Sequence, residues 1–237
     1  MKITKLLVPI VLIIALICGG AVYVNDYYRD DGVALSALQS DGSVAVSKEY
    51  FGYYFDGPST ENALVFYPGG KVEETAYAPL LHKLAARGVD VFLVKMPARL
   101  AFFGINKADD LTANFNYSRW YIGGHSLGGV AASSYASKNA ASFDGLILLA
   151  SYSTKALPES LDTLLVYGSL DGVLNTGSYE QCKQNLPGGF TEVIIEGGNH
   201  AGFGSYGAQK GDGQAAITPG EQTKKTAEII LDFIAQK

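Results

Sequence analysis

The chain has 237 residues, of which 48% are hydrophobic and 11% aromatic. That composition is enough to fill a core, so it excludes a disordered chain, and two cysteines are too few for a disulfide-stapled miniprotein. A formal net charge of −5 argues against a nucleic-acid-binding protein, which needs a basic surface to meet phosphates. The length fits one larger domain or two small ones.

Residues 6–24 form an uncharged run that follows two lysines and precedes three aspartates. As a helix this run would span about 28 Å, close to the hydrocarbon thickness of a bilayer. The flanking charges predict an uncleaved signal anchor over residues 1–24, with the membrane as a partner and the rest of the chain outside the cytoplasm. A cleaved signal peptide, which would make the protein secreted, and a lipoprotein anchor at Cys18 are the alternatives.

In the remainder of the chain, short apolar runs typical of strands alternate with segments that have a helical hydrophobic period. Residues 25–43 are polar and mixed, and we expect a juxtamembrane stalk there. Short apolar runs predict strands at residues 44–46, 50–55, 63–67, 91–94, 120–124, 146–149, 164–167 and 193–195. Helical periods predict helices at residues 73–87, 127–139, 180–186 and 223–234, with an irregular helical stretch at 98–116. The alternation predicts a single α/β domain over residues 44–237, with a mostly parallel central sheet and helices on both faces.

The strongest motif is Gly124-His125-Ser126-Leu127-Gly128, which lies directly after an expected strand and directly before an expected helix. This is the G-x-S-x-G nucleophile elbow in the context that it requires. Such a sharp turn strains the serine backbone and favours glycine two positions to either side. The helix dipole and the N–H of Leu127 would favour a negative charge developing beside Ser126. We therefore predict that Ser126 is a nucleophile; the alternative is a serine that caps the helix.

A serine nucleophile needs a general base, and the chain has three histidines. His125 lies inside the elbow and should point away from the serine, and His82 lies in the middle of a helix. His200 is on a loop at the carboxyl end of a strand, where ligands bind in such sheets. Asp171 follows the preceding strand, and the order Ser, Asp, His is the order expected with this elbow. We predict that Asp171 orients His200; the alternative is an aspartate that forms a turn before a glycine.

The oxyanion of an acyl-transfer reaction needs a second backbone donor, which we expect from the loop at residues 68–72. Gly70 and Lys71 are both candidates, and the sequence alone does not choose between them. Residues 151–162 are too few to form a lid domain, so we expect an open pocket bordered by short loops. The aromatic residues expected to line it and bind substrate are Phe102, Phe103, Phe203 and Tyr206.

The elbow, the ordered triad and the glycine loop resemble the α/β-hydrolase superfamily over residues 44–237. The stretches 67–72, 94–97 and 198–207 look like a compact bacterial branch related to the dienelactone hydrolases. Those enzymes usually carry a cysteine nucleophile, whereas this chain has Ser126. The resemblance implies the α/β-hydrolase fold and hydrolase chemistry without a cofactor.

These motifs predict a serine hydrolase of the carboxylesterase type that cleaves a small acyl substrate through an acyl-enzyme. Small esters, thioesters and acetylated glycans are the expected substrates. Two other classes remain open: a catalytically silent binding module, and a triad enzyme of another reaction type such as an amidase or acyltransferase. Neither a metal-ligand spacing nor a phosphate-binding loop is present in the sequence.

Overall fold

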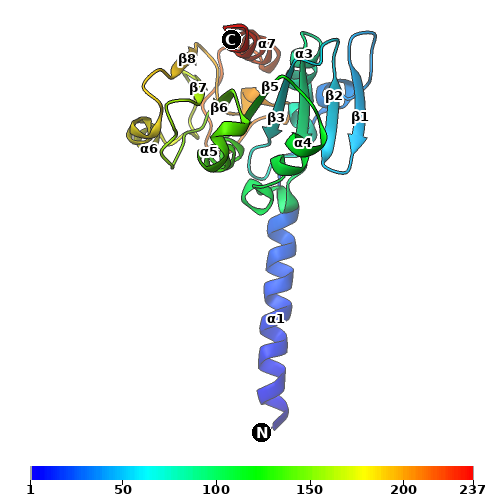
Figure 1. The fold of residues 1–237 in the computed structure, drawn as a ribbon. Coiled ribbons are helices and arrows are strands. Elements are labelled where there is room, and N and C mark those ends of the chain that lie inside the picture. The colour runs from blue at the N-terminus through cyan, green and yellow to red at the C-terminus, as the bar shows by residue number, and fades with distance from the viewer. Residues whose placement is uncertain (1, 237) are drawn as a thin grey trace.

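The computed structural model describes residues 2–236, and within them the domain is built on an eight-stranded sheet (Figure 1). The strand order is β1-β2-β4-β3-β5-β6-β7-β8. The strands are β1 (Ala45–Glu49), β2 (Gly52–Asp56), β3 (Asn62–Tyr67), β4 (Val89–Val94), β5 (Arg119–His125), β6 (Gly145–Leu149), β7 (Asp162–Gly168) and β8 (Thr191–Ile195). The β1–β2 and β2–β4 pairs are antiparallel, and the other neighbours are parallel. The predicted mostly parallel sheet is confirmed.

Helices cover both faces of the sheet, as predicted. The helices of the domain are α2 (Gly32–Ser36), α3 (Ala78–Ala85), α4 (Ala108–Asn114), α5 (Leu127–Asn139), α6 (Thr176–Cys182) and α7 (Pro219–Ala235). Successive side chains of β3 point to opposite faces, so Leu64 and Phe66 belong to the core beneath α3 and α7. Ala63 and Val65 belong to the second core, which α4, α5 and α6 cover. Both faces of β3 are therefore buried, which explains its continuous apolar run.

Several element boundaries differ from the prediction. Helix α7 starts at Pro219 rather than at residue 223, because Thr218 and Glu221 form a reciprocal capping box in front of it. The irregular stretch at residues 98–116 divides into short 3₁₀ turns and helix α4. These differences move the ends of elements and leave their order unchanged.

The N-terminal helix α1 (Lys2–Asn25) stands clear of the domain, on the side toward which β3 points (Figure 1). In the part of the chain that the structure describes, no helix is long and apolar enough to cross a membrane. The transmembrane segment predicted for residues 1–24 is therefore not confirmed, and the membrane as a partner has no support. The location outside the cytoplasm stays a prediction.

The segment expected to be a stalk, residues 25–43, packs against the domain. The Tyr28 N–H donates to the Lys71 carbonyl over 2.8 Å, and the Asp31 N–H donates to the Ser205 carbonyl over 3.0 Å. Ala34 on α2 is fully buried. This segment therefore reaches the loop at residues 68–72, where the oxyanion donor was expected.

Candidate active site

Ser126 occupies a strained turn between β5 and α5. Its backbone angles are φ 53° and ψ −123°, in a region that non-glycine residues seldom adopt. A Cβ on Gly124 would lie 2.5 Å from the Tyr67 carbonyl oxygen, and one on Gly128 would lie 2.2 Å from the same atom. Only glycine fits at these two positions, because strand β3 passes directly beside the turn. The sharp turn presents Ser126 at the carboxyl edge of the sheet and at the start of α5.

Asp171 and His200 meet at the same edge of the sheet. The Nδ1 atom of His200 lies 2.8 Å from Oδ2 of Asp171, and the two side chains are 1% and 2% exposed. The other oxygen of Asp171 accepts the N–H groups of Val173 and Leu174, each over 2.8 Å. Both carboxylate oxygens are therefore used, one to hold its own loop and one to hold the imidazole.

His200 lines the same cleft as Ser126. His200 Nε2 is buried and has no hydrogen-bond partner among the described residues. Ser126 and His200 line one cleft of about 190 Å³. Its other lining residues are Leu127, Val130, Ala150, Ser151, Tyr152, Val173, Leu174 and Asn175. An imidazole held by a carboxylate, on a residue that shares a cleft with a serine, is an arrangement that can activate a hydroxyl.

The four aromatic residues expected to bind substrate do not line this cleft. Phe102 and Phe103 are 47% and 68% exposed, on the 3₁₀ turn Ala101–Gly104. Phe203 is fully buried against His125, with ring centroids 5.5 Å apart, and Tyr206 is buried against other tyrosines. The cleft is lined instead by residues from the loops after β6 and β7. The rule that ligands bind at the carboxyl ends of strands points to those loops, but it does not choose residues within them.

The loop after β3 lies against the elbow, and its hydrogen bonds separate the two candidate oxyanion donors. The Lys71 N–H donates to the Arg99 carbonyl over 3.0 Å, and the Gly69 N–H donates to the Tyr77 hydroxyl over 3.0 Å. The N–H of Gly70 between them forms no hydrogen bond among the described residues. A Cβ on Gly70 would lie 2.8 Å from Cδ2 of Leu127, so this loop touches the residue after Ser126. The geometry favours Gly70 over Lys71.

A buried Tyr77–His125 pair supports this loop. The Tyr77 hydroxyl accepts the Gly69 N–H and lies 2.8 Å from Nδ1 of His125. Burial, followed by the neighbouring charge of His200, holds the pKa of His125 well below its ordinary value. Burial also raises the pKa of Tyr77. Both groups therefore stay neutral, and a hydrogen bond joins the Tyr77 hydroxyl to Nδ1 of His125.

Replacing Tyr77 by phenylalanine should destabilise the domain. The change leaves the Gly69 N–H and His125 Nδ1 buried without a partner, and each such group costs about 1–3 kcal/mol. We expect the free energy of unfolding to fall by about 2–4 kcal/mol, as measured by urea denaturation followed by circular dichroism. Tyr50→Phe, at a side chain that is 72% exposed, is the control and should change it by less than about 0.5 kcal/mol. Equal stability of the two variants would contradict a structural role for the buried hydroxyl.

Within the described residues, no group of three or more His, Cys, Asp or Glu side chains is placed to hold a metal ion. The polar groups that the structure brings to this edge of the sheet are the Ser126 hydroxyl, the His200 imidazole and backbone N–H groups. Groups of these kinds are the ones that an acyl-transfer reaction requires, because charge develops on a carbonyl oxygen.

The chain belongs to the α/β-hydrolase family: residues 63–224 match the family model described as "Alpha/beta hydrolase family". This membership assigns the protein to the hydrolase class of enzymes. The matched region contains Ser126, Asp171 and His200. No curated protein matches the chain.

Solved structures of the same fold include esterases and a dienelactone hydrolase. Est1E from Butyrivibrio proteoclasticus is 14% identical with a TM-score of 0.56, and the match covers 82% of this chain and 100% of that one. Naproxen esterase from Bacillus subtilis is 12% identical with a TM-score of 0.57, over 85% of this chain and 94% of that one. Dienelactone hydrolase from Anabaena variabilis is 14% identical with a TM-score of 0.57, over 84% and 98%. At such identities these likenesses show the fold alone.

Proposed function

We propose that the protein is a serine hydrolase that cleaves small carboxylic esters through a Ser126–His200–Asp171 triad. The observation that carries the proposal is the 2.8 Å contact between Asp171 and His200, since His200 lines one cleft with Ser126 and its Nε2 has no partner among the described residues. The strained backbone of Ser126 supports it further, because such strain is kept where it serves function.

In the proposed mechanism, His200 Nε2 accepts the hydroxyl proton of Ser126 as Oγ attacks the carbonyl carbon of the ester. The N–H groups of Leu127 and Gly70 hold the oxyanion, and one such donor typically contributes about 3 kcal/mol in the transition state. The bond to the leaving alcohol then breaks, and His200 gives the alcohol its proton.

Water completes the reaction. His200 accepts a proton from the water as its oxygen attacks the acyl carbon, and the proton passes to Oγ of Ser126 as the carboxylic acid leaves. Asp171 stays ionised throughout and stabilises the imidazolium that forms in each half of the reaction. Its two bonds to the N–H groups of Val173 and Leu174 keep the carboxylate in place while the proton moves.

The size of the cleft favours a short acyl group. Its volume of about 190 Å³ is below the usual range of pockets for larger ligands, and Val173 and Leu174 are among the residues that line it. Residues 151–162 form no lid domain, because the chain runs from β6 to β7 through a short loop. The site is therefore suited to a small ester rather than to a long-chain lipid.

A panel of p-nitrophenyl esters from acetate to decanoate tests this preference. We expect kcat/KM to be highest for acyl groups of two to four carbons and to fall for longer ones. Val173→Ala should raise the relative rate on the hexanoyl ester by about tenfold, since one methylene group in a hydrophobic pocket changes rates by about 10- to 200-fold. Val33→Ala, at a side chain that is 62% exposed, is the matched control and should leave the profile unchanged. A preference for long chains with interfacial activation would contradict the proposal.

A further inference from the structure

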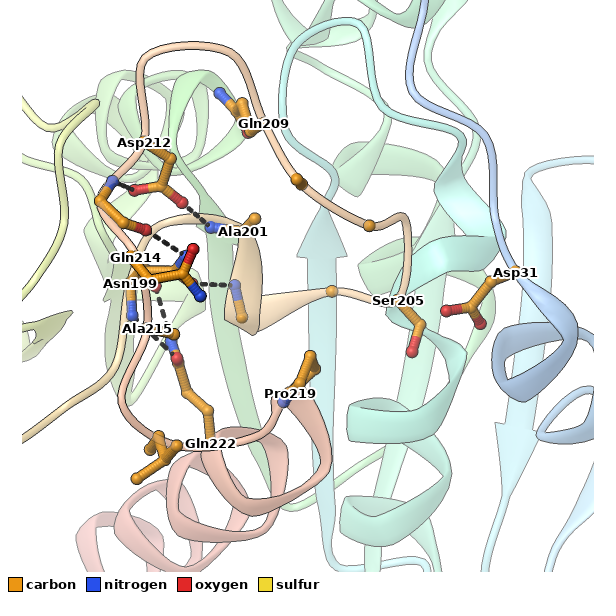
Figure 2. Close-up of a pocket in the computed structure, with 16 residues that line it drawn as sticks. Asp31, Asn199, Ala201, Ser205, Gln209, Asp212, Gln214, Ala215, Pro219 and Gln222 are labelled. Carbon is orange, nitrogen blue, oxygen red and sulfur yellow. Dashed lines mark hydrogen bonds between the residues drawn. The ribbon is translucent and has the colours of Figure 1, made fainter.

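The loop between residues 204 and 218 carries an aspartate whose carboxylate is fully engaged with backbone N–H groups. Oδ1 of Asp212 accepts from Gly172 over 3.1 Å, from His200 over 3.2 Å and from Gly213 over 2.8 Å. Oδ2 accepts from Ala201 over 2.8 Å, a bond drawn in Figure 2. Hydrogen bonds to an ionised acceptor are stronger than bonds between neutral groups, so this carboxylate is an anchor for the chain around it.

Asp212 joins the two loops that carry the proposed acid and base. Gly172 directly follows Asp171, and the N–H groups of His200 and Ala201 belong to the base and its neighbour. The two loops follow the neighbouring strands β7 and β8, and the Leu170 N–H also donates directly to the Gly198 carbonyl over 2.8 Å. The backbone also packs closely here: a Cβ on Gly213 would lie 1.9 Å from the Leu170 carbonyl oxygen, so only glycine fits.

Two neutral side chains, those of Gln222 and Asn199, also form hydrogen bonds with the backbone around His200. The Gln222 side chain, 1% exposed, accepts the Asn199 N–H over 3.0 Å and donates to the Asn199 carbonyl over 2.7 Å. The Asn199 side chain accepts the Gly202 N–H and donates to the Gly213 carbonyl. Figure 2 shows Asn199, Asp212 and Gln222 converging on this loop. Of these three side chains, only Asp212 also bonds to the loop of Asp171 among the described residues.

We infer that Asp212 is a positioning residue that sets the distance and angle between the Asp171 carboxylate and the His200 imidazole. The inference rests on the proposed function for its effect on rate. Asp212 does not line the cleft of Ser126, so it acts on the reaction through the backbone of His200 and Gly172. Its removal should therefore change the chemical step more than the binding of substrate.

The test is Asp212→Asn, which preserves size and replaces one acceptor oxygen by an NH₂ group facing the Ala201 N–H. We expect kcat on a short ester to fall by about 10- to 100-fold, with KM within about twofold of the wild type, because a displacement of 1 Å can cost 100-fold in rate. Asp232→Asn is the matched control, because it removes the same charge from an exposed site on α7. Asp232 lines a pocket at the amino ends of β3 and β5, and the proposed triad lies at the carboxyl edge of the sheet. The control should keep the wild-type kcat and KM.

A second readout separates this inference from the proposed function. The low-field proton resonance of His200 Nδ1–H, assigned by its loss in His200→Ala, reports the bond to Asp171 whether or not any ester is hydrolysed. We expect it to shift or broaden in Asp212→Asn and to be unchanged in Asp232→Asn. If the wild type proves inactive, this resonance still decides the role of Asp212.

If circular dichroism shows that Asp212→Asn is unfolded, Asp212→Ser is the second variant, because its smaller side chain leaves room for water at the N–H groups. It should show the same loss in kcat and the same change in the resonance. An unaltered resonance together with wild-type kcat in a folded variant would overturn the positioning role and leave the proposed triad intact.

Discussion

Replacing Ser126 by alanine is expected to lower kcat/KM for a short ester by about 10⁴-fold or more, while the fold is retained. The loss is that large because the hydroxyl is the atom that forms the acyl-enzyme, and only the oxyanion donors and binding would remain. Steady-state kinetics with p-nitrophenyl acetate measure the loss. Ser137→Ala on the same helix α5 is the control and should keep the wild-type rate, since among the described residues the Ser137 hydroxyl bonds only to the Ser134 carbonyl.

The opposite result would point to another nucleophile. Ser151 also lines the cleft, and its Oγ donates to the Ser126 carbonyl over 2.8 Å. If Ser126→Ala retained most of the activity, Ser151→Ala would be the next variant to assay. Retained activity in both variants would contradict the proposed mechanism.

The second large effect is expected for Asp171→Asn, which should reduce kcat by about 10³- to 10⁴-fold. The asparagine oxygen can still accept the N–H groups of Val173 and Leu174, so its NH₂ group must face His200. Nδ1 would then have to accept, and the proton would sit on Nε2, which could no longer take the proton of Ser126. The variant should therefore fold normally and lose its chemistry.

Initial rates and melting temperatures of Asp171→Asn and Asp232→Asn, measured side by side, check this expectation. Both changes remove one negative charge, and only the first alters the imidazole. A rate for Asp171→Asn within about threefold of the wild-type rate would contradict this expectation. It would mean that His200 acts as a base without the Asp171 carboxylate and that the asparagine does not force the proton onto Nε2.

The sequence predicts those parts of the site whose geometry depends on residues that are close together in the chain. Ser126 could be predicted because the turn from β5 to α5 admits only glycine at positions 124 and 128, and that requirement is written in five consecutive residues. Asp171 and His200 could be predicted because each lies on the loop that follows an apolar run, and the carboxyl ends of parallel strands meet at one edge. Their hydrogen bond is in the structure, and their role in catalysis stays a proposal.

The pocket could not be predicted in the same way, because its lining depends on how loops fold back. Phe203 belongs to the 3₁₀ turn Ala201–Phe203, which directs its ring into the core against His125. The choice between Gly70 and Lys71 depends on the carbonyl of Arg99, which reaches Lys71 through a turn where Ala98 and Arg99 both have positive φ. A sequence pattern contains no sign of such a contact.

Asp212 lies in a segment without hydrophobic periodicity, so no pattern marked it. The positioning role that we infer for it rests on four backbone N–H groups that donate to one carboxylate, three of them on the loops of Asp171 and His200.

The fold class, in contrast, could be predicted because hydrophobic periodicity is present. Alternating strand and helix periods extend over the whole domain, so shifts in the ends of α6 and α7 do not change it.

Labelling with a fluorescent fluorophosphonate shows whether Ser126 is an activated serine. The wild type should take up one label, and peptide mapping should place it on Ser126. Ser126→Ala should remain unlabelled, and Asp171→Asn should label far more slowly. A label on any other residue, or no label on well-folded wild type, would mean that Ser126 is not activated. The latter result would favour a binding module built on the hydrolase fold.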